Sequence, residues 1–225
     1  MIESGKHAVI VGKTGSGKSQ QLLYQAQVCD QPVIILDTKL DDDFLYLARK
    51  NQKLVVCDDY RGLSIQLKKD DADYIIVRPQ EFELAEPKAL DNYLSLIYNK
   101  SGDKTVCLDE AYQFHSGAGR AGAGVISLLT RGRSRGLSLV SCTQRPVWIS
   151  KFLLSESSYF FVYELGQKTD RKAVSDCVAY DGENPPRFHY YYSDFTMQNS
   201  ELREPVKVFK RREPPPRNGF FNFFK

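Results

Sequence analysis

One short run of residues constrains the fold more than any other part of the sequence. Residues 12–19 read Gly-Lys-Thr-Gly-Ser-Gly-Lys-Ser, directly after the apolar run 8–11 and directly before a helical pattern. Glycines at these positions let backbone N–H groups curl around phosphates, and the following helix presents its positive N-terminal end to them. The run therefore predicts a phosphate-binding loop between a strand and a helix.

The same loop gives candidate roles to single residues. Lys18 would reach the β- and γ-phosphates of ATP, and the Ser19 hydroxyl would bind Mg²⁺. A chance glycine-rich turn is the alternative interpretation, which the flanking strand and helix patterns disfavour. The residues expected to hold the nucleotide are Gly12, Lys13, Thr14, Gly15, Ser16, Gly17, Lys18 and Ser19.

A second motif places two carboxylates after another apolar run. Residues 105–108 are followed by Asp109 and Glu110. The carboxyl ends of parallel strands are where ligands bind, so Asp109 would reach Mg²⁺ through water and Glu110 would polarise the attacking water as general base. A solvated strand end is the alternative. Beside a phosphate-binding loop, the pair favours hydrolysis of a nucleoside triphosphate.

A third motif, residues 141–146, ends a further apolar run with Ser-Cys-Thr-Gln-Arg-Pro. If this run is a central parallel strand beside the strand at 7–11, Gln144 can sense the γ-phosphate or orient water. A residue that only forms a turn is the alternative for a glutamine at this position. Gln144 is therefore the candidate sensor.

Three arginines alternate just before that strand, at positions 131, 133 and 135. The run 130–136 could be a solvated loop, a contact with DNA phosphates, or the source of an arginine finger that reaches a neighbouring subunit's ATP. The two specific roles both need the planar geometry of arginine rather than lysine.

The chain alternates short β-branched runs with longer helical patterns, which is typical of a parallel sheet covered on both faces. We expect an α/β fold with a central, mainly parallel sheet. The expected strands are 7–11, 33–37, 54–57, 74–78, 105–109, 137–142 and 159–163, and the expected helices are 18–29, 42–50, 87–98, 121–133 and 169–178.

The chain has 225 residues, enough for one buried domain over 1–182 and an aromatic, basic and proline-rich extension over 183–225. From residue 203 onward seven basic and two acidic residues give a charge of +5, whereas residues 1–202 carry 24 basic and 26 acidic groups, or −2. The body is therefore no general polyanion binder. The extension could be a strap on its own domain or a neighbour, a docking segment through Phe220, Phe221, Phe223 and Phe224, or disordered.

Five cysteines form no Cys-x-x-Cys pair, and no apolar run reaches the ~18 residues that a membrane span needs. A cytoplasmic compartment follows as the expectation.

The order of these motifs resembles the FtsK–HerA superfamily of ring-forming, DNA-translocating ATPases. The resemblance covers most of residues 5–180: the run 12–19, then Asp-Thr-Lys at 37–39, the Leu-Asp-Glu-Ala at 108–111, and above all the arginine-rich turn that leads into the strand ending in Thr-Gln-Arg-Pro. It implies a RecA-like, ASCE-type P-loop NTPase. A motor of this size is most similar to the genome-packaging ATPases of icosahedral viruses with internal membranes.

The resemblance also implies a mechanism and partners. It makes Lys18 and Ser19 the phosphate and Mg²⁺ ligands, Asp109 and Glu110 the Walker B pair, and Gln144 the sensor. Arg133 matches the arginine of the GRxxG turn and is the expected trans finger, with Arg131, Arg135 and Arg145 as rivals.

The implied assembly is a homo-oligomeric ring of roughly five or six subunits around double-stranded DNA. The ring would work in the host-cell cytoplasm, or at a packaging vertex of the virion, where the extension would contact a capsid or membrane protein. Three alternatives remain open: a filamentous-phage type assembly or secretion ATPase, a P-loop small-molecule kinase, and a nucleotide-binding scaffold without turnover.

Overall fold

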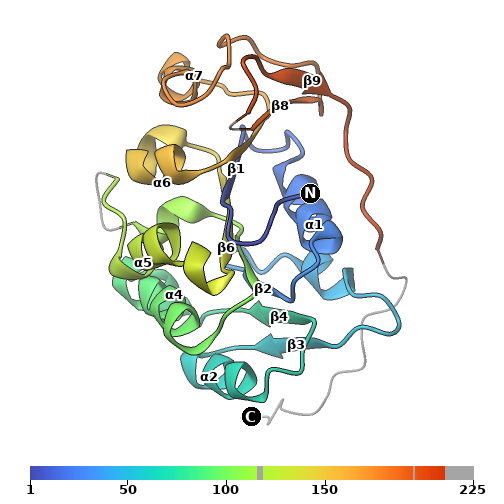
Figure 1. Ribbon diagram of the computed structural model, residues 1–225, viewed down its shortest axis with the longest axis vertical. Helices are drawn as coiled ribbons and strands as arrows, with labels where there is room; N and C mark the ends of the chain where they lie inside the picture. Colours follow the sequence, from blue (N-terminus) through green and yellow to red (C-terminus); the bar gives the residue numbers. More distant parts are fainter. Residues whose placement is uncertain (116–118, 195, 211–225) are drawn as a thin grey trace.

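Nine strands form one sheet in the part of the chain that the computed structural model describes, residues 1–115, 119–194 and 196–210. Their order across the sheet is β3-β4-β2-β5-β6-β1-β7-β8-β9 (Figure 1). All neighbours from β3 to β7 are parallel, and β8 and β9 add antiparallel pairs. The strands are β1 (Ala8–Val11), β2 (Val33–Leu36), β3 (Leu54–Cys57), β4 (Tyr74–Val77), β5 (Thr105–Leu108), β6 (Ser138–Thr143), β7 (Tyr159–Val162), β8 (Tyr190–Asp194) and β9 (Glu201–Arg203).

The sheet is buried on both faces along β1, β2, β4 and β7, which explains why these strands are continuous apolar runs rather than alternating ones. Side chains of a strand point to opposite faces in turn. In β1, Val9 and Val11 belong to the core on one face, whereas Ala8 and Ile10 belong to the core on the other. In Figure 1, α1 covers one side of the sheet and α4, α5 and α6 cover the opposite side.

The helices begin where the sequence supplies a cap or a turn. Asp59 accepts a hydrogen bond from Gly62 N at 2.6 Å and starts α2, and Pro87 occupies the first turn of α4. The α-helices are α1 (Lys18–Val28), α2 (Tyr60–Lys69), α3 (Glu81–Leu84), α4 (Pro87–Lys100), α5 (Ala123–Arg131), α6 (Lys151–Glu156) and α7 (Lys168–Ser175). Short 3₁₀ turns are η1 (Asp42–Tyr46), η2 (Ala111–Phe114), η3 (Arg133–Arg135) and η4 (Pro146–Trp148).

The seven expected strands are confirmed to within a residue or two, and the main differences concern helices. The α-helix expected at 42–50 is wrong, because only the 3₁₀ turn η1 forms there. The Asp41 side chain accepts from Asp43 N at 3.0 Å, and such local bonds compete with helical ones. The helices α2, α3 and α6 and the strands β8 and β9 lie outside the expected elements.

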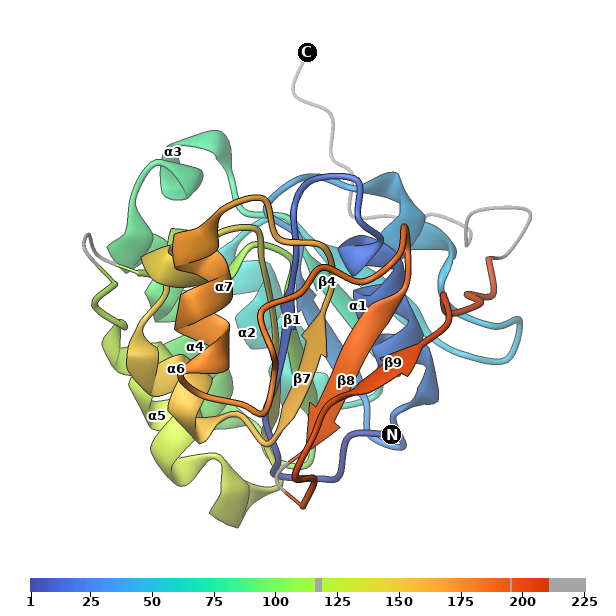
Figure 2. The ribbon, with the colours of Figure 1, turned by 90° about the horizontal axis from the view of Figure 1, so that it is seen from above.

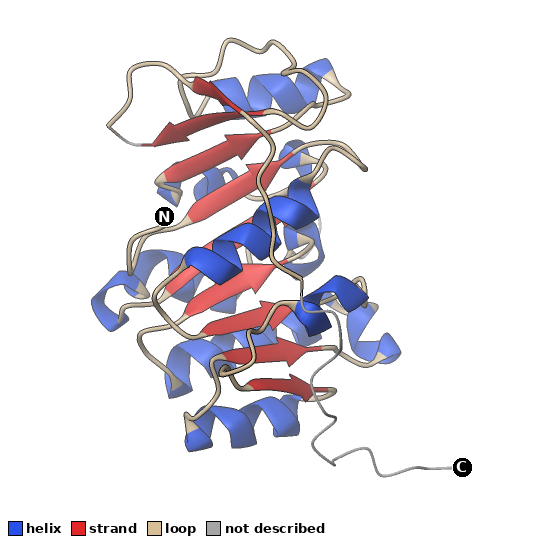
Figure 3. Cartoon of the chain, turned by 90° about the vertical axis from the view of Figure 1, so that its right-hand side faces the viewer, coloured by secondary structure: helices blue, strands red, loops and turns tan. Residues whose placement is uncertain are grey.

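The described part of the C-terminal extension continues the sheet and then crosses it. β8 pairs with β7 and β9 pairs with β8, so these strands lie side by side in Figure 2. The chain then runs along the side that α1 covers (Figure 3), where Gln27 exchanges hydrogen bonds with the Phe209 backbone and Lys210 pairs with Asp43. The domain division at residue 182 stays a prediction, and the Phe-rich end lies outside the described residues.

Candidate active site

The loop 12–19 links the carboxyl end of β1 to the first turn of α1, and its glycines occupy positions that other residues could not. Gly15 and Gly17 have φ angles of +74° and +110°, a region that L side chains rarely adopt. A Cβ on Gly12 would lie 2.6 Å from both Ser16 Oγ and Tyr163 Cβ. The curl of the backbone therefore depends on these glycines, and it precedes a helix N-terminus as phosphate binding requires.

Lys18 lies inside this curl rather than in solvent. Its side chain is buried, and its Nζ donates to the Lys13 carbonyl at 2.7 Å. Burial lowers the pKa of Lys18. On the outer flank of the loop, Lys13 pairs with Glu164 through its side chain and donates its backbone N–H to the Glu164 carbonyl at 2.7 Å. The loop is thus tied to the segment after β7, with one lysine inside it and one outside.

A hydroxyl inside the loop supports its assignment to phosphate. Ser16 Oγ is buried and has no hydrogen-bond partner among the described residues. Buried polar atoms are almost always paired, so such an atom indicates a ligand or water. Mg²⁺ prefers oxygen donors, and the Ser19 hydroxyl at the start of α1 together with the Asp109 carboxylate supplies that chemistry. The residues present therefore fit a Mg²⁺-bound triphosphate.

Asp109 follows β5, which is separated from β1 by the single strand β6. Both oxygens of its buried carboxylate accept hydrogen bonds: Oδ1 from Thr38 N at 3.1 Å and Thr38 Oγ1 at 2.7 Å, and Oδ2 from Lys39 N at 3.0 Å. Burial raises the pKa of Asp109, and these bonds oppose the rise. The segment after β2 therefore fixes the orientation of this carboxylate.

Glu110 is 1% exposed and is held from two sides. Lys39 Nζ forms an ion pair with its Oε2 at 2.9 Å, and the Gln144 side-chain amide donates to the same oxygen at 3.1 Å. The Gln144 backbone N–H donates to Oε1 at 3.4 Å. A carboxylate buried this deeply and held by charge and amide groups is typical of a functional site.

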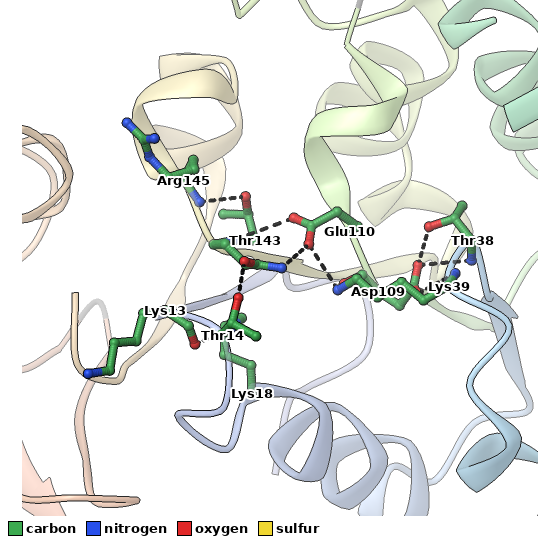
Figure 4. A network of polar contacts seen from close by, with 10 residues as sticks. Lys13, Thr14, Lys18, Thr38, Lys39, Asp109, Glu110, Thr143 and Arg145 are labelled. Atoms are coloured by element: carbon green, nitrogen blue, oxygen red, sulfur yellow. Dashed lines mark hydrogen bonds and ion pairs between the residues drawn. The ribbon is translucent and has the colours of Figure 1, made fainter. Parts of the chain in front are cut away.

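Gln144 connects the phosphate-binding loop to the acidic pair. β6 pairs with β1 and with β5, so Gln144 at its carboxyl end lies between the two motifs, as expected if this strand is central. Its Oε1 accepts from Thr14 Oγ1 at 2.5 Å, while its amide nitrogen reaches Glu110 (Figure 4). A ligand that displaced Thr14 would therefore change the hydrogen bonds of the Gln144 side chain, and through that side chain the surroundings of Glu110.

Sequence reasoning missed the role of the segment after β2. The motif at 37–39 gives Lys39 no role of its own, yet its Nζ contacts both Glu110 and the Asp109 carbonyl, the latter at 2.9 Å. Burial opposes the charged form of Lys39, but the Glu110 carboxylate and then Asp109 offset this, so that its pKa is raised. The signal was available, because polar residues that end a parallel strand next to β5 must share its edge.

The arginine candidates lie in different places. Arg133 precedes β6, whereas the phosphate-binding loop follows β1, so the two lie at opposite edges of the sheet. Arg131 and Arg135 both lie over the Tyr98 ring, at 5.0 Å and 5.2 Å. Arg145 is on the carboxyl side, where its Nε pairs with Asp170 at 2.9 Å. The structure therefore gathers Lys18, Asp109, Glu110 and Gln144 at one edge and leaves Arg133 out of that cluster.

Similarity to known proteins agrees with this arrangement. The sequence is 27% identical over 220 residues to the DNA packaging ATPase P9 of Enterobacteria phage PRD1, covering 92% of this chain and 89% of that protein. The chain is a homologue of that packaging ATPase. No protein-family model matches it.

Solved structures of other proteins share the fold of this chain. The genome packaging NTPase B204 of Sulfolobus turreted icosahedral virus 2, solved with ATPγS, superposes with a TM-score of 0.69 at 16% identity, over 90% of this chain and 98% of that one. The plasmid coupling protein TrwB, solved with the GTP analogue GDPNP, gives a TM-score of 0.64 at 14% identity over 94% and 88% of the two chains. The expected P-loop NTPase fold is confirmed. No helix of the described residues has the length and apolar character to cross a bilayer.

Proposed function

We propose that this protein is an ATPase that translocates double-stranded DNA as a viral genome-packaging motor. The observation that carries the proposal is the convergence of three strand ends: the loop after β1, the acidic pair after β5 and Gln144 after β6 form one hydrogen-bonded cluster. The similarity to P9 extends over nearly the whole chain that contains this cluster. Because that relative is a DNA packaging ATPase, we infer that the cargo of this protein is also DNA.

The cluster supports separate roles for its residues. The loop N–H groups and Lys18 bind the phosphates, and the Ser19 hydroxyl and Asp109 carboxylate hold Mg²⁺, which when bound neutralises charge on the β- and γ-phosphates. Glu110 accepts a proton from the attacking water. Gln144 is hydrogen-bonded to Glu110 and transmits to it the presence of the γ-phosphate. Thr14 and Gln144 already share a hydrogen bond, so the sensing path needs no new contact between them.

Arg133 acts in this proposal on the ATP of a neighbouring subunit. It is exposed, and its guanidinium makes no hydrogen bond or ion pair with any described residue, unlike that of Arg145, which is held by Asp170 and Gln167. β6 contains six residues and so spans about 20 Å. An arginine at the amino edge therefore cannot serve the loop of its own subunit, but a ring of roughly five or six subunits could present it to the next one.

The remaining assignments concern location and partners. We place the ring in the host-cell cytoplasm or at the packaging vertex of the virion, with double-stranded DNA in its channel. The C-terminal extension would contact a capsid or membrane protein through its basic and aromatic residues.

The test is the ATPase rate of the purified protein with and without double-stranded DNA, with assembly followed by light scattering. The expected result is DNA-stimulated hydrolysis by an oligomer, lost in Lys18→Ala. Hydrolysis without any response to DNA, in a protein that stays monomeric, would contradict the motor. Phosphate transfer to a small molecule would instead identify a kinase.

A further inference from the structure

Lys39 occupies an unusual position between the two carboxylate residues after β5. Its Nζ lies 2.9 Å from Glu110 Oε2 and 2.9 Å from the Asp109 carbonyl oxygen. Glu110 is 1% exposed, whereas the Lys39 side chain is 36% exposed. The lysine therefore enters the site from a solvent-accessible turn and ends on a buried base.

This ion pair affects the chemistry required of Glu110. A general base must accept a hydrogen bond from water at one of its oxygens. Oε2 carries both the ammonium of Lys39 and the Gln144 amide, and Oε1 faces the Gln144 backbone N–H. Hydrolysis is favoured when the ammonium moves away from Glu110.

A second anion for Lys39 would lie close by when ATP is bound. Lys39 and Glu110 both act electrostatically on Lys18, the residue at the centre of the phosphate-binding loop. Figure 4 shows Lys18 and Lys39 entering the same region from the loop and from the segment after β2. A γ-phosphate held by Lys18 would thus stand within the field of Lys39, whereas ADP would place no group there.

The turn that carries Lys39 is built to be fixed at its base and strained at its tip. Asp37 accepts from Asp41 N at 2.9 Å and pairs with Arg78 Nε at 2.9 Å, which fixes both ends of the turn. Leu40, directly after Lys39, has a φ angle of +57° and is 52% exposed. A non-glycine residue in this region is strained, and such strain is found at switch segments.

We propose that Lys39 is a positioning residue that restrains Glu110 and releases it by exchanging the carboxylate for the γ-phosphate of bound ATP. The proposal rests on the ATPase function proposed above. It couples the presence of a triphosphate to the availability of the base, because a ligand shifts such an equilibrium only through differential contacts, and ATP and ADP differ in the γ-phosphate alone.

The test compares the affinities of ATPγS and ADP, both with Mg²⁺, by titration calorimetry. Lys39→Met should weaken ATPγS binding about tenfold or more, the effect of losing a charged hydrogen bond, and leave ADP binding within about twofold. Lys39→Arg should restore most of the preference for the triphosphate. The control is Lys104→Met, which also removes a lysine paired with a carboxylate, that of Asp70, but at the opposite edge of the sheet. That control should change neither affinity.

A double-mutant cycle with Glu110→Gln distinguishes two roles of Lys39: exchange between Glu110 and the γ-phosphate, and structural support of the site alone. In the protein that retains Lys39, Glu110→Gln removes the carboxylate that competes for the lysine and should tighten ATPγS binding relative to ADP binding. In the Lys39→Met protein, the same change should leave the ratio unaltered. Equal weakening of both nucleotides by Lys39→Met, or an identical effect of Glu110→Gln in both backgrounds, would overturn the role of Lys39.

The two proposals fail in different ways. Absence of ATPγS binding to the unmodified protein, or full binding by Lys18→Ala, would refute the ATPase function itself. Normal binding that Lys18→Ala abolishes, together with an unchanged ATPγS-to-ADP ratio in Lys39→Met, would refute only the exchange. Melting curves of each variant identify any loss of fold, and a variant that does not fold is replaced by Lys39→Gln.

Discussion

The acidic pair and the run of arginines lie at opposite edges of the central sheet and differ in how deeply they are buried. At the carboxyl edge, Asp109 and Glu110 are almost fully buried and are bonded to residues from neighbouring strand ends. At the amino edge, Arg131 ends α5 and Arg133 and Arg135 lie in η3. All three are exposed, and Arg131 and Arg135 lie over the Tyr98 ring.

The difference separates groups that perform chemistry within one subunit from groups available to another molecule. Burial of charge is costly even when the charge is paired, and it is retained where a function requires it. The carboxyl edge is therefore organised for a ligand bound by the same subunit. Exposed arginines cost little to hold in solvent and can reach a second subunit or DNA. Four substitutions test this contrast.

Lys18→Ala should have the largest effect, because it removes the cation inside the loop. We expect ATPγS binding and ATP hydrolysis both to be lost. Calorimetry and a phosphate-release assay measure the two properties, and Lys53→Ala, which alters an exposed lysine paired with Asp71, is the control. Retained binding would show that the carboxyl edge does not hold the phosphates.

Arg133→Ala should reduce DNA-stimulated hydrolysis by about 10³- to 10⁵-fold, the effect of losing an arginine finger. The affinity of the isolated subunit for ATPγS should not change, because the side chain lies at the opposite edge from its own loop. Arg49→Ala, on an exposed arginine outside this run, is the control. A loss of affinity in the isolated subunit would mean that Arg133 acts on its own site.

Glu110→Gln should reduce hydrolysis by about 10²- to 10⁴-fold, as expected for loss of a general base. Nucleotide binding should persist, because the phosphates are held by the loop. Single-turnover rates measure the chemical step directly. Glu83→Gln, which alters a carboxylate bonded to Tyr93, controls for the change of charge. Residual turnover equal to that of Lys18→Ala would refute the division of roles.

His7, at the amino edge, is a titratable group that contributes to the stability of the fold rather than to the nucleotide site. Its Nδ1 accepts from Leu139 N at 3.1 Å and its Nε2 faces the Leu129 carbonyl at 3.3 Å, so the neutral ring is the bonded form. Burial lowers the pKa of His7 to about 4. The unfolded chain, with a pKa near 6.5, binds more protons below that value, so this contribution to stability is complete above pH 6.5 and is lost as the pH falls towards 4.

From pH 7 to pH 5, His7 should lower the free energy of unfolding by about 2 kcal/mol. Urea unfolding at the two pH values measures the change, and His7→Gln should remove this part of it. His189→Gln, on a half-buried histidine, is the control. The same pH dependence in His7→Gln and the unmodified protein would contradict the assignment.

Much of the fold followed from the sequence because its signals are local. Apolar runs buried on both faces read as strands, and the glycines and lysine of 12–19 have one common use between a strand and a helix. The position of Gln144 beside Glu110 required one further assumption, that its strand is central, and the sheet order agrees.

The missed features depend on contacts between distant segments. Lys39 and Glu110 lie 71 positions apart in the sequence, and nothing near Lys39 identifies its partner. The N-terminus of α5 is similarly capped from α4, where Asp91 accepts from Gly124 N at 2.8 Å and Val125 N at 3.0 Å. β8 lies in an aromatic stretch whose pairing with β7 depends on the sheet edge being open.

A structure of the protein with Mg²⁺ and ATPγS tests the central claim most directly. We predict the phosphates within residues 12–19, the γ-phosphate facing Glu110 and Gln144, and the Lys39 ammonium turned from Glu110 towards that phosphate. Nucleotide bound away from this loop, or a γ-phosphate out of reach of Glu110, would contradict it.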